Sequence, residues 1–151
     1  MRWTLVVLVV VMVILSLRSH PSRAREPATA GALVSVATTF EHDYQHNVDG
    51  PVWDRFDEAS RALIPRARYV SWHHSCPNTT GDATVLRATR RAHGWWEVDY
   101  EIGGVTLHDY WRYVAGQWRF SLVRSNPGAA ALYASDFASF ARATGCAAVA
   151  G

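Results

Sequence analysis

Three strands and two tight turns can be aligned against one another from residues 95–124 alone. The turns are Gly103-Gly104 and Ala115-Gly116, each between runs that alternate apolar with polar residues. Because neighbouring strand residues point to opposite faces, a slip of one position would exchange the faces, so the pattern fixes the register. One face then collects three rows: Trp96/Trp111/Phe120, Val98/Asp109/Leu122 and Tyr100/Leu107/Arg124.

The opposite face of these strands is mostly polar and charged, and we expect it to face solvent. Its rows are Trp95/Arg112/Arg119, Glu97/Tyr110/Ser121 and Asp99/His108/Val123. The first face is aromatic and apolar apart from Asp109 and the rim residue Arg124, so it is the face that packs on the rest of the protein. A carboxylate placed there must be paired, neutralised or used in chemistry.

Three helices are predicted before this block. Apolar residues recur at helical spacing over about residues 30–47, 51–63 and 65–75. Asp49-Gly50-Pro51 separates the first two helices, and Pro65 opens the third.

A fourth strand and a last helix complete the predicted fold. The strand runs over about 84–92, and a turn through Gly94 places Arg91, Thr89 and Arg87 beside Glu97, Asp99 and Glu101. After a short turn at 129–133, Ser135 caps a helix that ends at Gly145. The fold class is therefore α+β, with three N-terminal helices packed on a four-stranded antiparallel meander and a short C-terminal helix.

An apolar leader precedes this domain. Residues 3–17 are interrupted only by Thr4 and Ser16, a length that suits a signal-peptide core of roughly 7–15 residues better than a membrane span of about 20. We expect a helical leader within 1–24 that is either a signal peptide or a membrane anchor, and residues 3–17 contact the membrane if it is uncleaved. The remaining chain divides into a linker over 25–29, a domain over 30–146 and a tail over 147–151.

The two cysteines, Cys76 and Cys146, lie far apart and lack the spacing of a metal or redox motif. The simplest use is one disulfide, which would stabilise the domain by about 4 kcal/mol and suits an oxidising compartment outside the cytoplasm. The alternative is two buried free thiols in a cytosolic protein.

The charge of the chain excludes a nucleic-acid partner. Its formal net charge is +2, every basic residue is an arginine, and no basic run exceeds Arg90-Arg91. Removing Arg2, Arg18 and Arg23 with the leader leaves twelve arginines against thirteen acids, a net charge of −1. An electrostatic footprint for phosphates is therefore absent.

The order of these elements resembles the nuclear transport factor 2-like superfamily, as does the hairpin Asp109-Tyr110-Trp111 to Gly116-Gln117-Trp118-Arg119-Phe120. The resemblance covers about residues 30–133. It implies a cone, in which a curved sheet wraps long helices around an apolar cavity, as in SnoaL-like polyketide cyclases and ketosteroid isomerases. The leader, the cysteine pair and the extra C-terminal helix are instead similar to the membrane-anchored scaffold members, including the inner-membrane assembly factor of type IV secretion systems and the Mce-associated proteins.

Asp109 is the strongest candidate for a catalytic group. Desolvation in a cavity would raise its pKa and make it a general base, the role that the resemblance implies for a cavity carboxylate. The alternative is a structural carboxylate paired with Arg90 or Arg124, or one that accepts hydrogen bonds from Tyr100 or His73. His73, on the apolar side of its helix, could complete a His–Asp dyad or be a hydrogen-bonded core residue.

The aromatic residues of the inner face have two interpretations. They could line a ligand cavity, or they could fill the core that holds sheet to helices. The candidate cavity-lining residues are Trp72, Trp96, Tyr100, Trp111, Phe120, Arg90 and Arg124.

The outer face offers a candidate interface of Trp95, Tyr110, Arg112 and Arg119, because exposed aromatics beside arginines are typical of binding hot spots. The alternative is that the C-terminal helix covers this face and buries Trp95 beneath Phe137 and Phe140. His42 and His46 have the spacing of two metal ligands, but both lie on the solvent side of their helix without a third ligand, so no metal is predicted.

The sequence favours a domain of the cell envelope, exported or membrane-anchored, that binds without catalysis and uses no cofactor. Its partner could be an envelope protein, a second copy of the chain or a small apolar ligand. The alternative is a SnoaL-like isomerase, cyclase or dehydratase with Asp109 as its general base. An open cavity at Asp109 would favour the enzyme, whereas tryptophans filling that space would favour a scaffold.

Overall fold

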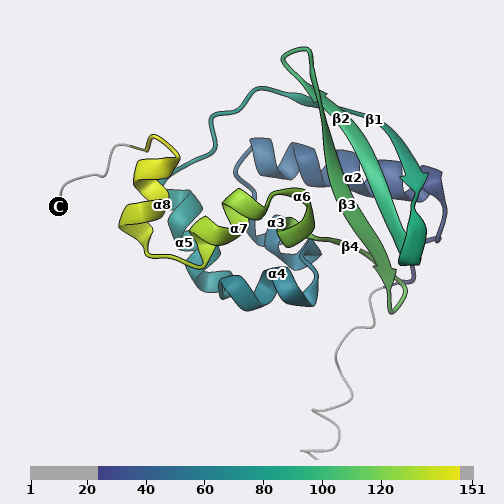
Figure 1. Ribbon diagram of the computed structural model, residues 1–151, viewed down its shortest axis with the longest axis horizontal. Coiled ribbons are helices and arrows are strands. Elements are labelled where there is room, and N and C mark those ends of the chain that lie inside the picture. The colour runs from purple at the N-terminus through teal and green to yellow at the C-terminus, as the bar shows by residue number, and fades with distance from the viewer. Residues whose placement is uncertain (1–23, 147–151) are drawn as a thin grey trace, which may run out of the picture.

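The computed structural model describes residues 24–146, so the predicted leader and the tail over 147–151 lie outside the described part. The described chain is α+β, and its helices come both before and after the sheet along the sequence (Figure 1). Before the sheet come α2 (Ala30–Gln45), α3 (Asp49–Arg55), α4 (Glu58–Leu63) and α5 (Arg66–Ser75). After it come α6 (Leu122–Ser125), α7 (Pro127–Tyr133) and α8 (Phe137–Ala143).

The sheet is a four-stranded antiparallel meander in the order β1-β2-β3-β4. Its strands are β1 (Ala83–Arg90), β2 (Trp95–Ile102), β3 (Val105–Val114) and β4 (Gln117–Phe120). Both predicted two-residue turns are confirmed, and in each the two residues have positive φ, 58° and 80° at Gly103-Gly104 and 52° and 84° at Ala115-Gly116. Such angles match the right-handed twist of the flanking strands.

The register between β2 and β3 is the one that the sequence predicts. Trp96 pairs with Trp111, Val98 with Asp109, and Tyr100 with Leu107. The alternation of apolar and polar residues therefore identified the buried face correctly.

The predicted rows through Leu122 and Arg124 are wrong, because β4 ends at Phe120. The Ser121 N–H still donates to the carbonyl of Tyr110, but the next residue begins α6. The Leu122 N–H instead donates to the buried Ser60 hydroxyl on α4, at 2.9 Å. A helix far away in sequence thus ends the strand.

The predicted register of β1 is wrong by two positions. Arg87 pairs with Asp99, and Thr89 pairs with Glu97. The reason is the turn: His93 and Gly94 both have positive φ, and the Arg91 N–H donates to the Trp95 carbonyl, so the chain reverses directly after Arg91. A shift of two preserves the faces, so residues 87–90 keep their predicted sides. A bulge between Val85 and Arg87 changes the alternation nearer the start of the strand, where Val85 pairs with Tyr100.

The helix predicted over 51–63 is two helices. The chain is extended at Phe56, which forms a bridge with Phe120, and the Asp57 carboxylate caps α4 by accepting from the Ser60 N–H at 2.9 Å. At the other end of the domain, the turn predicted at 129–133 is part of α7. Asp136 caps α8 in place of Ser135, because its carboxylate accepts from the Ser139 N–H.

One part of the core lies between α2 and the inner face of the sheet, and Figure 1 shows α2 crossing behind the strands. Leu33, Ala37 and Phe40 of α2 are buried, and Phe40 meets Trp111 edge to face with ring centroids 5.2 Å apart. The remaining helices lie together to the left of the strands in Figure 1. The predicted disulfide Cys76–Cys146 is present and joins the end of α5 to the chain after α8. Among residues 24–146, no helix has the length and apolarity needed to cross a membrane.

The segment predicted as a linker, 25–29, lies against the domain. Glu26 donates its backbone N–H to the Gly116 carbonyl and accepts from the Trp118 N–H through its carboxylate. The Trp118 indole N–H donates to the carbonyl of Pro27 at 3.0 Å. These contacts fasten the start of the described chain to the β3–β4 hairpin.

Candidate functional site

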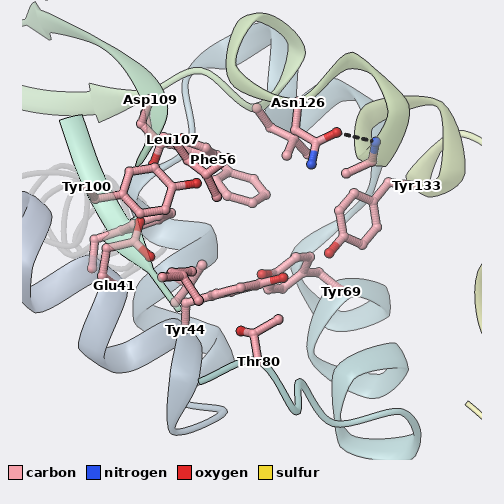
Figure 2. Close-up of a pocket in the computed structure, with 16 residues that line it drawn as sticks. Glu41, Tyr44, Phe56, Tyr69, Thr80, Tyr100, Leu107, Asp109, Asn126 and Tyr133 are labelled. Atoms are coloured by element: carbon pink, nitrogen blue, oxygen red, sulfur yellow. Dashed lines mark hydrogen bonds between the residues drawn. The ribbon is translucent and has the colours of Figure 1, made fainter. Parts of the chain in front are cut away.

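A cavity of about 220 Å³ lies between the inner face of the sheet, α2 and α7. Figure 2 shows Tyr100, Glu41 and Asp109 on one side of it and Tyr133 on the other. The lining is largely aromatic and aliphatic, with two carboxyl groups: Phe40, Glu41, Tyr44, Val52, Phe56, Tyr69, Thr80, Tyr100, Ile102, Leu107, Asp109, Phe120, Leu122, Asn126, Ala129 and Tyr133.

The two carboxyl groups, Glu41 of α2 and Asp109 of β3, are hydrogen-bonded to each other. Both residues are buried, each with 6% of its surface exposed. Two carboxyl groups can bond in this way only when one of them carries a proton, so the pair shares a proton. The arrangement is the one known from catalytic carboxyl dyads, in which two like charges at contact distance cannot both form.

Burial sets the protonation of this pair. Desolvation raises the pKa of Glu41 from 4.5 to about 7, against the opposing effect of its hydrogen bond with Asp109. The pKa of Asp109 is raised well above its ordinary value by desolvation and by the charge of Glu41, although the Ser125 hydroxyl lowers it. The two groups therefore titrate as a pair, and the pair keeps its shared proton to a higher pH than a solvent-exposed carboxyl group would.

Two tyrosines extend the polar wall around the pair. Desolvation raises the pKa of Tyr44 and of Tyr100, and the charges of Glu41 and Asp109 raise both further. Both phenols therefore stay protonated and can donate a hydrogen bond to a ligand or to water. The wall thus presents two phenol donors and one ionisable carboxyl pair.

The cavity opens between three segments. Thr80 comes from the loop before β1, Leu107 from β3, and Asn126 from the start of α7, and all three are exposed. The Asn126 side chain also accepts from the Ala129 N–H at 2.9 Å, which fixes the first turn of α7 at the rim. The rim of the cavity is therefore exposed to solvent, while the carboxyl pair lies deeper and is buried.

The prediction that Asp109 pairs with an arginine is wrong. Arg90 is inward in register, beside Trp96, but it is exposed and does not line the cavity. Arg124 lies on the outer face, where its guanidinium stacks over Trp95 and Tyr110 at 4.9 and 4.6 Å. The early end of β4 is the reason, because α6 turns Arg124 away from the row that the sequence assigned to it.

The predicted dyad of His73 with Asp109 is also wrong. The His73 ring shares a 2.5 Å hydrogen bond with the Tyr133 hydroxyl, and its other nitrogen lies 3.7 Å from the Asp49 carboxylate. His73 lines a neighbouring cavity of about 260 Å³ on the far side of Tyr44 and Tyr133. Burial lowers its pKa to about 4, so the ring is neutral at pH 7.

Of the predicted cavity-lining residues, Tyr100 and Phe120 line the cavity and three tryptophans do not. Trp111 is fully buried between Phe40 and Phe120, and Trp96 packs edge to face on Trp118. Trp72 packs on Phe137 and Phe140 of α8. The tryptophans thus form the core beside the cavity and leave its volume open.

The outer face carries the predicted aromatic and cationic residues. Arg112 lies over the ring of Trp95 at 4.1 Å, and the Tyr110 hydroxyl donates to Glu97 at 3.0 Å. Arg119 bends toward α3, where it donates to the Asp54 carbonyl at 2.6 Å. The alternative that α8 covers this face is wrong, because Phe137 and Phe140 pack on Trp72 instead.

Among the described residues, one group of three acidic or histidine side chains is close enough together to hold a cation: Glu97, Asp99 and His108 on the outer face. Arg91 already pairs with Glu97, and Arg87 pairs with Asp99 at 2.6 Å. These arginines supply the counter-charge that a metal would bring, so the group is better described as a surface ion-pair ladder.

Glu41 is the candidate site residue that the sequence interpretation missed. It follows Ala37 by four positions and lies between Phe40 and Tyr44, inside the apolar stripe of its helix. A charged residue within such a stripe is the signal that could have found it.

Comparison with known proteins leaves the site without a family assignment. No protein-family model and no curated protein sequence matches this chain.

Proposed function

We propose that the protein is a small-molecule-binding domain of the cell envelope, with a nuclear transport factor 2-like arrangement of helices on a sheet. The observation that carries the proposal is the open cavity that reaches the Glu41–Asp109 pair. Ligand sites are concave and mostly apolar, with a few polar groups that orient the ligand, and this cavity has that composition.

The volume of the cavity indicates the size of the ligand. About 220 Å³ exceeds the roughly 150 Å³ that holds a benzene molecule in an engineered cavity, and it is below the roughly 300–1,000 Å³ of sites for drug-sized compounds. We therefore expect a ligand with about one ring. The disulfide Cys76–Cys146 supports a location outside the cytoplasm, where such bonds persist.

Matched variants of α7 test this function. Ala129 lines the cavity, whereas Ala131 of the same helix is exposed. Single-ring compounds are screened against the full chain by NMR, and those that bind in the cavity shift signals of Tyr100 and Leu107. Ala129→Phe should abolish this binding by filling the cavity, and Ala131→Phe should leave it unchanged. Binding that is equal in both variants, or a screen with no cavity ligand at millimolar concentration, would contradict the proposal.

Proton-transfer catalysis, as in a SnoaL-like isomerase, cyclase or dehydratase, is a second candidate function. It is favoured by Glu41, whose pKa of about 7 suits a general base, next to Asp109, whose raised pKa suits a general acid. Exchange of the α-hydrogens of cyclohexanone with deuterated solvent measures such proton transfer directly. The parent should accelerate exchange and Glu41→Gln should not, and equal rates would remove this candidate.

An envelope partner is a separate proposal for the outer face. Trp95 and Arg112 are stacked there, beside Arg124 of α6. This stacked pair has the composition of a binding hot spot. Cross-linking in the native envelope should lose its products when both residues are changed to alanine, with folding intact.

A further inference from the structure

We infer that the cavity selects a small organic cation, a protonated amine of about one ring, which pairs with the single negative charge that the Glu41–Asp109 pair carries in its singly protonated form. This inference rests on the proposed ligand-binding function and adds the charge of the ligand to it.

The charges that face the cavity are all acidic. Among the described residues that line it, Glu41 and Asp109 are the ionisable carboxyl groups, and none is an arginine or a histidine. Elsewhere the same protein pairs its carboxylates with arginine: Asp99 with Arg87, Glu26 with Arg55, and Glu97 with Arg91. The buried pair is thus left with a negative charge that the described protein does not neutralise, and a buried charge calls for a partner.

The rest of the wall suits a cation. Five aromatic side chains line the cavity together with the carboxyl pair: Phe40, Tyr44, Phe56, Tyr100 and Phe120. The face of an aromatic ring attracts a cation by up to about 2 kcal/mol when water is excluded. An anionic ligand would meet the negative pair without compensation, and a neutral one would leave its charge unpaired.

Protonation of the pair predicts how binding depends on pH. The ionisable groups near Glu41 are Asp109 from β3, Tyr44 from α2, Tyr100 from β2, and Asp49 and His73 beyond Tyr44. The tyrosines stay neutral, and His73 is neutral above its pKa of about 4. Below pH 7 Glu41 takes up a proton, and the pair becomes neutral. A cation must then displace that proton, so its affinity should fall about tenfold per pH unit as the pH decreases.

Three probes of nearly equal size test the inference: benzylamine, benzyl alcohol and benzoate. Their dissociation constants for the full chain in mild detergent are measured by calorimetry at pH 7.5, with detergent alone as the blank. We expect benzylamine to bind at least tenfold more tightly than benzyl alcohol, and benzoate not to bind. Between pH 7 and pH 5.5 only the affinity for benzylamine should decrease.

Two variants assign the effect to the pair. Glu41→Gln keeps the shape and removes the charge, so it should reduce the affinity for benzylamine to that for benzyl alcohol. Glu58→Gln removes a carboxylate from the exposed face of α4 and should change neither affinity. Near-ultraviolet circular dichroism verifies that both variants keep the native aromatic packing.

The outcomes separate the two proposals. Equal affinity for the amine and the alcohol, or an amine preference that survives Glu41→Gln, overturns the inference and leaves the ligand cavity standing. Preferential binding of benzoate overturns the inference as well. If none of the three probes binds and the single-ring screen also finds no ligand, both proposals fail.

Discussion

Two aspartates on neighbouring strands, one on each face of the sheet, have pKa values that are shifted in opposite directions. Asp109 of β3 faces inward and Asp99 of β2 faces outward, and they are almost equally covered, with 6% and 4% of their surface exposed. The pKa of Asp109 is nevertheless raised and that of Asp99 is lowered. Burial alone therefore does not decide the direction of the shift.

The difference lies in the partners. Burial by itself would raise the pKa of Asp99, but hydrogen bonds from His108 and Arg87 outweigh it. Asp109 meets a second carboxyl group, Glu41, so both burial and charge raise its pKa. The outer face thus pairs its carboxylates with arginine and histidine, whereas the inner pair has no basic partner among the described residues that line the cavity. The proposed ligand site rests on this contrast.

The largest expected difference between the faces is in packing. Trp111→Ala on the inner face should lower the free energy of unfolding by roughly 3–5 kcal/mol, because the fully buried ring contacts Phe40 and Phe120 and leaves a cavity. Trp95→Ala on the outer face should cost less than about 1 kcal/mol, since it loses only contacts with exposed arginines. Urea denaturation measures both. Similar losses would mean that the outer face is part of the core.

A smaller effect concerns the pH dependence of the inner face. The raised pKa of Glu41 means that the folded state holds a proton that the unfolded state releases, so stability should fall as the pH rises from 4.5 to about 7. The full difference is up to about 3 kcal/mol. Glu41→Gln should remove this pH dependence. The difference in unfolding free energy, variant minus parent, should therefore be more favourable to the variant at pH 8 than at pH 4.5.

The comparison with a variant is needed because His73 acts in the opposite direction. Its lowered pKa makes stability rise with pH between about 4 and 6.5 in parent and variant alike. Denaturation of both proteins at a series of pH values isolates the contribution of Glu41. Parallel curves for parent and variant would show that Glu41 is ionised or solvated in the folded protein.

The outer ion pairs should give a smaller effect still. Asp99→Asn should lower stability by about 1 kcal/mol at pH 7, because the Arg87 side chain is 74% exposed and solvent weakens the pair. The lowered pKa of Asp99 means that this stabilisation exists above its ordinary pKa of 3.8 and is lost as the pH falls further. The difference between parent and variant should therefore shrink below pH 3.8.

Asp109→Asn is the matched change on the inner face. Because the raised pKa of Asp109 favours its neutral form and the residue has no arginine partner among the described residues, the variant should be close to the parent in stability at pH 7. Thermal denaturation of the two asparagine variants compares the faces directly. A larger loss for Asp109→Asn than for Asp99→Asn would indicate a buried counter-charge and reverse the comparison.

The sequence by itself determined the faces of the sheet and the register of β2 with β3. Strand alternation and two-residue turns are local properties, and the pairing of Trp96 with Trp111 follows from the residues between them. The sequence also indicated which carboxylate, Asp109, faces inward and which cysteines are joined. It could not give the end of β4, because the Ser60 hydroxyl that binds the Leu122 N–H comes from α4.

Tertiary structure alone decided the partner of Asp109. The sequence offered Arg90, Arg124 and His73, each chosen from an extrapolated row or a helical stripe. The position of Glu41 opposite Asp109 depends on the angle and height at which α2 crosses the sheet, and packing of Phe40 against Trp111 and Phe120 sets these. Such packing sums many weak contacts between distant segments, and no local pattern encodes its result.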